Sequence, residues 1–265
     1  MKTGFIGAGN MAGAILRGAV ASGNFKPEEL GAFDVDTAKT AQLQSEIGIH
    51  PFASVEELIR ACDAVVLAVK PKMFPEVIAQ IREFVAEKQP LILSIAAGKT
   101  IAAITEFFGF EPALVRVMPN INAKAGASMS AYCPNGQVGA DQETYVARLL
   151  ASFGRCMKLD EEYFPLFGVI AGSAPAFAYM FIDALARAGV KHGMAKPQAL
   201  EIAAQTVLGS AELILHGKEH PWALIDAVCS PGGTTIEGIA ALEAHGLDTA
   251  VMQAVDAAIE KDAKI

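Results

Sequence analysis

Residues 2–12 read KTGFIGAGNMA, a short apolar run followed directly by a glycine-rich turn. The turn matches the pattern G-x-G-x-x-G/A, in which Gly7 makes a tight bend and Gly9 lets the backbone approach a pyrophosphate. Asn10 and Met11 would then open a helix whose first N–H groups and positive dipole end face phosphates. The alternative, a turn without a ligand, is disfavoured because strand, turn and helix follow in the order the motif requires.

The first half of the chain alternates short apolar runs with helical patterns. Strands are expected at 2–6, 30–33, 63–69, 91–95 and 114–118. Helices are expected between them at 10–21, 37–46, 72–87 and 101–108. Nearly pure apolar runs are typical of parallel strands that are covered on both faces. The alternation therefore predicts an α/β Rossmann domain with a doubly wound parallel sheet.

Near residue 160 the strand signal fades, and the rest of the chain has helical patterns only. Breaks between helices are expected at 172–175, 192–194, 216–218 and 230–233, where glycine or proline interrupts the pattern. We predict a dinucleotide-binding Rossmann domain over residues 1–160 and an all-helical domain over residues 161–265.

Residues 163–182 form a run of twenty residues without charge, which is long enough for a membrane span. Proline and glycine interrupt this run, acidic residues precede it, and no basic flank orients it. We interpret the run as a helix that is buried against a second subunit, and we expect no membrane partner.

Composition narrows the class of protein. Apolar residues make up 52% and charged residues 19%, which is typical of a folded globular chain. The net charge of −8 and the lack of basic runs argue against nucleic acid as a partner. The four cysteines form no C-x-x-C pair, so neither a metal site nor a disulfide scaffold is expected. No secretory signal precedes Lys2, and a cytoplasmic location is expected.

Asp34 closes the second expected strand, where a carboxylate can bind the adenosine ribose hydroxyls and repel a 2′-phosphate. This position favours NADH over NADPH. Two alternatives remain open: a carboxylate that only caps the following turn, and a nearby Lys39 that attracts a 2′-phosphate.

Three further strand ends carry candidate cofactor contacts. They are Ala68, Val69, Lys70 and Pro71 after the third strand, Ala97 after the fourth, and Asn120 after the fifth. Ligands of open α/β sheets bind outside the carboxyl ends of the strands, and small residues there leave room for a nicotinamide ring. Ordinary strand-to-helix turns are the alternative, including an Asn120 amide that bonds its own turn.

Residues 230–235 read SPGGTT and precede an amphipathic helical run. Gly232 and Gly233 at a helix start would expose several backbone N–H groups, which suits a substrate carboxylate. The hydroxyls of Ser230, Thr234 and Thr235 would lie beside them. A plain helix cap is the alternative.

None of the five histidines lies in these motifs. Hydride transfer to a ketone normally needs a nearby acid, whereas an iminium carbon is already electrophilic. A site of hydroxyls and N–H groups therefore suits an imine better than a ketone.

Five segments together resemble the pyrroline-5-carboxylate reductase family: 5–12, 68–71, 116–120, 171–177 and, above all, DAVCSPGGTT at 226–235. The resemblance runs from end to end. It implies NADH- or NADPH-dependent reduction of 1-pyrroline-5-carboxylate to L-proline, the last step of proline biosynthesis. It also implies a Rossmann domain followed by a helical dimerisation domain that interlocks with its twin, and in some members a decamer of five dimers.

The resemblance assigns roles residue by residue. The N–H groups of Gly233 and Thr234 would hold the pyrroline carboxylate, with Ser230 assisting. Thr235 would hydrogen-bond the ring nitrogen and help deliver its proton. The nicotinamide would lie near Ala97 and Asn120, in a site that both subunits of the dimer assemble.

Two segments depart from the family pattern. Many relatives read MPNTPA where this chain has MPNINA at 118–123, which loses a hydroxyl and a rigid proline. The common GSGPAY becomes GSAPAF at 172–177, and Phe177 is expected only to pack.

Three other functions are alternatives. A β-hydroxyacid dehydrogenase would need a lysine where this chain has Ala178, which argues against it. A reductase of another cyclic imino acid would use the same carboxylate site. A non-catalytic nucleotide-binding sensor would keep Gly7 and Gly9 without needing residues 230–235 intact.

Overall fold

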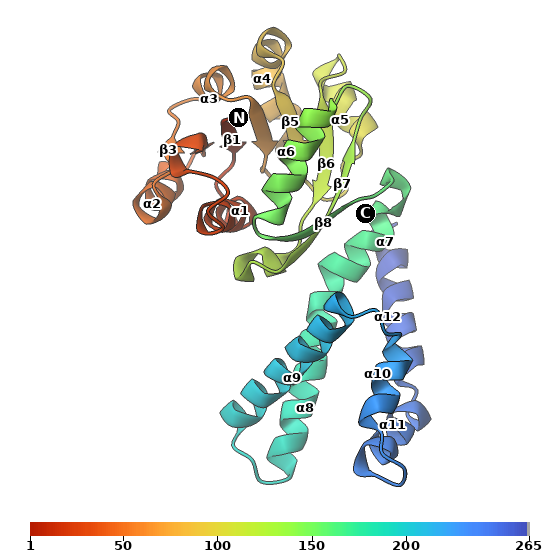
Figure 1. Cartoon of the computed structure of the whole chain (residues 1–265). Helices are drawn as coiled ribbons and strands as arrows, with labels where there is room; N and C mark the ends of the chain where they lie inside the picture. The colour runs from red at the N-terminus through yellow and green to blue at the C-terminus, as the bar shows by residue number, and fades with distance from the viewer. Residues whose placement is uncertain (264–265) are drawn as a thin grey trace. The chain divides into compact units, whose positions relative to one another are not determined.

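A computed structural model describes residues 1–263 of the chain (Figure 1). Its internal contacts divide the chain into two compact units, with the division between Gly172 and Ser173. The domain boundary at residue 160 stays a prediction. Each unit has its own architecture.

The first unit contains an eight-stranded sheet in the order β3-β2-β1-β4-β5-β6-β7-β8. The strands are β1 (Thr3–Ile6), β2 (Leu30–Phe33), β3 (His50–Pro51), β4 (Ala64–Leu67), β5 (Leu91–Ser94), β6 (Leu114–Met118), β7 (Ser128–Pro134) and β8 (Gly154–Lys158). All neighbouring strands are parallel except β6 and β7, which are antiparallel. The order from β3 to β6 is that of a Rossmann sheet, so the predicted α/β fold is confirmed.

Three strands were not expected from the sequence. β3 has only two residues, and β7 mixes serine, tyrosine and proline with apolar residues. β8 lies in the region where no strand was predicted. Most of its side chains are polar or exposed, so it lacks an apolar run. Short or exposed strands lack the apolar run by which a buried strand is recognised.

Helices cover both faces of this sheet (Figure 1). They are α1 (Asn10–Ala21), α2 (Thr37–Ile47), α3 (Val55–Ala61), α4 (Phe74–Lys88), α5 (Ile101–Phe108) and α6 (Ala140–Ala151). Alternate strand residues point to opposite faces, so Phe5 packs in one core with α1 and α6, while Ile6 packs in the other with α3, α4 and α5. Burial on both faces explains the continuous apolar strands.

A junction helix, residues 161–173, ends the first unit and continues by one residue into the second. A short 3₁₀ turn leads into α7 (Phe164–Phe167), which continues as a π-helical turn, Gly168–Ser173. The expected break at 172–175 is wrong, because α8 (Ala174–Lys191) follows directly. Pro175 lies in the first turn of α8, where a missing N–H is tolerated.

The second unit contains only helices within the part of it that is described. They are α8, α9 (Lys196–His216), α10 (Pro221–Val228), α11 (Thr234–Ala244) and α12 (Leu247–Asp262). The predicted all-helical domain is thus confirmed. Its buried side chains are three alanines, Ala186, Ala199 and Ala203, between α8 and α9.

Large apolar side chains of this unit are exposed in the single chain. Among them are Met180 at 78%, Leu213 at 64% and Met252 at 66% exposure. The helical stretch Glu161–Lys191 is long and apolar enough to cross a membrane by length and composition. Exposed apolar surface of this kind is typical of an interaction site.

Candidate functional site

The predicted cofactor residues gather at one edge of the sheet in the first unit. Ile6 pairs in register with Phe33 and Leu67, and Leu67 pairs with Ser94. The loops that follow β1, β2, β4 and β5 therefore begin side by side. These loops carry the predicted residues Gly7, Gly9, Asp34, Ala68 to Pro71 and Ala97.

Gly7 adopts a conformation that favours glycine, with φ at 102°. Its N–H donates to the Phe33 carbonyl oxygen at 2.7 Å, which ties the loop to β2. A Cβ atom at this position would lie 2.8 Å from the Ala68 carbonyl oxygen. The tight turn predicted at Gly7 is therefore built by close contact with the loop after β4.

The N-terminus of α1 opens at this edge. Gly9 precedes the helix with φ at −73°, and a Cβ atom added to it would meet no atom within 4 Å. Gly9 and Asn10 are exposed and Met11 is half-buried. The first-turn N–H groups of α1 point out of the helix, and together with the helix dipole they make an anion site of the kind that binds a pyrophosphate.

Asp34 is held by three hydrogen bonds within the protein. Its carboxylate accepts from the N–H of Ala8 at 2.8 Å and the N–H of Asp36 at 2.9 Å. Lys39 Nζ lies 3.3 Å from the same carboxylate and 3.6 Å from that of Asp36. Asp34 thus orders the glycine-rich loop, and Lys39 places a positive charge beside it.

These contacts keep Asp34 ionised. Partial burial opposes ionisation of the carboxyl, yet the three hydrogen bonds outweigh it and hold the pKa of Asp34 below its ordinary value. Because the folded pKa lies below the unfolded one, the ionised carboxylate stabilises the fold at neutral pH. That contribution is lost as pH falls through the folded pKa.

The loops after β4 and β5 present small or exposed residues at the same edge. Ala68 and Val69 are half-buried, Lys70 is exposed, and Pro71 begins a 3₁₀ turn. Ala97 is exposed and precedes Gly98, whose φ is 72°. Their cofactor contacts remain predictions.

Asn120 is placed differently from the other candidates, because it is buried and its amide already has protein partners. Its Oδ1 accepts from the N–H of Asn122 at 3.2 Å, and its Nδ2 donates to the Ala171 carbonyl at 2.9 Å. Its own N–H donates to Ser128 Oγ at 3.2 Å. The own-turn bond considered from the sequence is present, and a contact with the cofactor stays a prediction.

A partly buried ion pair near this loop was not predicted from the sequence. Arg116 on β6 donates to Glu161 Oε1 at 2.9 Å, and its guanidinium lies 4.4 Å from the centre of the Phe164 ring. Glu161 Oε1 also accepts from the N–H of Ile101 at 2.8 Å. The only available signal was the charged arginine inside the apolar strand LVRVM.

The predicted substrate residues lie in the second unit, at the start of α11. Gly232 has φ at 67°, and the N–H of Gly233 donates to the Ser230 carbonyl at 2.9 Å. With Pro231 in the second position, this is the arrangement of a type II turn. The turn occupies the N–H that was assigned to the carboxylate at Gly233.

The first turn of α11 offers further donors. Thr234 is exposed and Thr235 half-buried, and Gly233 supplies no side-chain cap. Within residues 1–263, the hydroxyls of Ser230, Thr234 and Thr235 make no hydrogen bond to protein. Free hydroxyls beside helical N–H groups can bind a carboxylate and a neighbouring polar atom.

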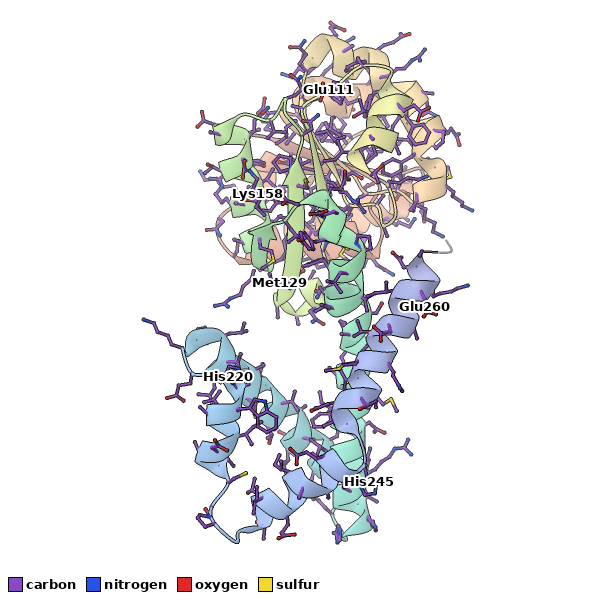
Figure 2. The ribbon with its side chains drawn as sticks, turned by 90° about the vertical axis from the view of Figure 1, so that its right-hand side faces the viewer. Glu111, Met129, Lys158, His220, His245 and Glu260 are labelled. Carbon is purple, nitrogen blue, oxygen red and sulfur yellow. The ribbon has the colours of Figure 1, made fainter. Side chains whose placement is uncertain are left out.

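Histidines of the second unit lie at helix ends. His220 begins α10 and accepts from the N–H of Trp222 at 3.3 Å, and His245 follows α11 (Figure 2). In the described part of the chain no group of three or more His, Cys, Asp or Glu residues is arranged to hold a metal ion.

Comparisons with known proteins cover both units. A family model described as "Pyrroline-5-carboxylate reductase dimerisation" matches residues 161–265, and one described as "NADP oxidoreductase coenzyme F420-dependent" matches residues 2–98. Pyrroline-5-carboxylate reductase of Escherichia coli (strain K12) is 39% identical over 265 residues, which cover 100% of this chain and 98% of that protein.

Two solved structures match nearly the whole chain. A pyrroline-5-carboxylate reductase from Coxiella burnetii has a TM-score of 0.94 and 29% identity, covering 99% of this chain and 97% of that one. The pyrroline carboxylate reductase of Plasmodium falciparum with NADP bound has a TM-score of 0.85 and 32% identity, with the same coverage.

Gly7→Ala and Gly9→Ala form a matched pair that tests the cofactor loop. At Gly7 the positive φ and the contact with Ala68 should cost roughly 1–3 kcal/mol of stability. At Gly9 the added methyl meets open space, so the fold should be unchanged. Binding of NADH and NADPH to Gly9→Ala should nevertheless weaken at least about tenfold, since the backbone can no longer approach a pyrophosphate.

Thermal unfolding and titration calorimetry measure these two effects separately. Full cofactor affinity in Gly9→Ala would show that the pyrophosphate does not pass over this loop.

Proposed function

Since the chain belongs to the pyrroline-5-carboxylate reductase family, we propose that it reduces 1-pyrroline-5-carboxylate to L-proline with NADH or NADPH, as the last step of proline biosynthesis. The observation that carries the proposal is the full-length match to relatives of that name. Both sequence motifs, GAGNMA at 7–12 and SPGGTT at 230–235, are intact.

A dinucleotide fits the carboxyl edge of the sheet. Open space over Gly9 and the free first turn of α1 leave room and donors for its pyrophosphate. Asp34 and Lys39, which lie 3.3 Å apart, would flank the adenosine ribose. We infer acceptance of both cofactors with a preference for NADH, because a carboxylate at this position repels a 2′-phosphate.

The substrate residues act through their hydrogen-bonding groups. When bound, the reduced nicotinamide supplies a hydride to the carbon of the C=N bond, and the ring nitrogen gains a proton as the double bond becomes single. The N–H of Thr234 and its neighbours in the first turn of α11 would hold the carboxylate with help from Ser230, while the N–H of Gly233 closes the turn that Gly232 shapes. Thr235 would hydrogen-bond the ring nitrogen and orient it for protonation.

The working enzyme is proposed to be a homodimer whose helical units cover each other. Exposed apolar side chains along α8, α9 and α12 support this proposal. In such a dimer the apolar stretch 161–191 would be covered by the second copy and not by a membrane. Light scattering would distinguish a dimer from a larger assembly such as a decamer.

The proposed setting is the cytoplasm, with neither nucleic acid nor a membrane as partner. The acidic net charge of −8 argues against a polyanion. The four cysteines are all free, which suits a reducing compartment.

The deciding experiment is oxidation of NADH and NADPH by the purified protein with racemic 1-pyrroline-5-carboxylate. Parallel assays use the six-membered cyclic imine, and a 3-hydroxy acid with NAD. Rapid turnover of the five-membered imine is the expected result. A preference for the six-membered ring would indicate another cyclic imino acid, and tight cofactor binding without turnover of any substrate would indicate a sensor.

Thr235→Ala should lower turnover on the order of a hundredfold, because it removes one donor that acts in the transition state. The dissociation constant of NADH should stay unchanged, since Thr235 lies outside the cofactor loop. Steady-state kinetics and cofactor titration test this. Thr144→Ala, on the outer helix α6, serves as the threonine control, and an unaltered rate in Thr235→Ala would refute the role of the hydroxyl.

Asp34→Ser should narrow the difference in kcat/KM between NADH and NADPH, because the repulsive carboxylate is lost. Lys39→Ala should act oppositely and lower efficiency with NADPH more than with NADH. Kinetics with both cofactors measure the ratios. If neither substitution changes the ratio, Asp34 serves only to order the glycine-rich loop.

A further inference from the structure

The Asn120 side chain contacts the junction helix at the carbonyl of Ala171, within its π-helical turn. In an α-helix the carbonyl of Ala171 would accept from the N–H of residue 175, but residue 175 is proline and has none. Asn120 Nδ2 donates to that carbonyl at 2.9 Å. The amide thus supplies a donor to this carbonyl at a point where Pro175 cannot supply the N–H of an α-helix.

The orientation of the amide is fixed from its other side. The N–H of Asn122 donates to Oδ1, so Nδ2 must face Ala171. Asn120 is only 5% exposed. Its acceptor end and one of its two amide hydrogens are therefore satisfied within the first unit.

The same helix is fixed to the sheet at further points. Arg116, four residues before Asn120, is paired with Glu161 at the beginning of the junction helix. Met118 packs against the cluster of Phe164, Phe167 and Ala171. β6 and the loop after it thus contact the junction helix at both its beginning and its π-helical turn.

We propose that Asn120 is a positioning residue that couples this loop to the junction helix through the Ala171 carbonyl, and that it does not hydrogen-bond the cofactor. Its effect on catalysis rests on the proposed function, in which the loop lies beside the nicotinamide and the helix leads to the unit that binds the imine. Loss of the contact should then impair imine reduction and leave cofactor affinity intact.

Asn120→Asp distinguishes a contact with the Ala171 carbonyl from a hydrogen bond to the cofactor, because the effect of the substitution on the first should depend on pH. One oxygen of the new side chain can still accept from the N–H of Asn122. The other repels the Ala171 carbonyl when the carboxyl is ionised and donates to it when protonated. Burial and this hydrogen bond to the neutral form both raise the pKa of such a carboxyl. The defect should therefore be large at neutral pH and shrink as pH falls.

We expect kcat/KM for the imine to fall at least about tenfold at neutral pH, as for an unsatisfied buried acceptor. The dissociation constant of NADH should change less than about twofold. The activity ratio of variant to wild type should rise on acidification. The ionisable side chains on the elements around Asn120 are Arg17, Arg116, Lys124, Tyr132, Cys133, Glu161, Glu162 and Tyr163. All of them are present in the wild type, in Asn120→Asp and in the control variant below.

Asn122→Ala is the matched control. It removes a neighbouring amide side chain and keeps the backbone N–H from which Asn120 accepts, so its ratio to wild type should not change with pH. Pro175→Ala supplies a second test, because it restores an N–H opposite the Ala171 carbonyl. The defect, or any failure to fold, of Asn120→Asp should be smaller in the Pro175→Ala background.

Hydrogen exchange gives a readout that needs no activity. Exchange in residues 168–176, corrected for intrinsic rates, should be faster in Asn120→Asp at neutral pH and approach wild type in acid. Unchanged exchange, a pH-independent ratio, a matching loss of cofactor affinity, or purely additive effects with Pro175→Ala would each overturn the proposal. A wild-type protein inactive on the imine, with the exchange difference present, would refute the proposed reaction alone.

Discussion

The parallel register of β1, β2, β4 and β5 is the constraint on which the rest of the cofactor edge depends. Adjacent parallel strands must end at the same side of a sheet, and Ile6, Phe33, Leu67 and Ser94 are paired there in a row. The loop that follows each strand can then carry different residues to the same edge of the sheet. A register slip would turn every apolar side chain toward the wrong core, so the two buried faces fix the edge as firmly as they fix the fold.

The glycine-rich loop is ordered by the protein itself. The N–H of Gly7 is hydrogen-bonded to β2 and that of Ala8 to the Asp34 carboxylate. The loop therefore loses its conformational entropy when the chain folds, and binding of a cofactor does not have to order it. From the sequence, Asp34 was predicted to bind the adenosine ribose, with a cap of the following turn as the alternative. In the folded chain its carboxylate accepts from the N–H of Ala8 and lies beside Lys39. Under the proposed function, one carboxylate would then influence both the geometry of the loop and the choice between NADH and NADPH.

Prediction from the sequence succeeded where a local pattern sufficed. The strands that carry the edge, and helices such as α1 and α5, follow from apolar runs and turn residues. The family resemblance, confirmed by the full-length matches, rested on two motifs that are each contiguous. The ion pair of Arg116 with Glu161 and the bond from Asn120 to Ala171 join residues 45 and 51 positions apart, respectively. Such contacts depend on packing, for which one sequence contains no periodic signal.

The small buried core of the helical unit indicates that this unit, which carries the SPGGTT motif, needs a partner for stability. Its own buried core consists of three alanines, within the residues described. Alanine buries little apolar area, so this core falls far short of the conformational entropy lost by ordering five helices. The family model that matches this unit is described as a dimerisation domain, and a second copy could supply the missing apolar area. In the proposed dimer the SPGGTT turn would precede a helix that association stabilises, so the proposed substrate site would form together with the dimer.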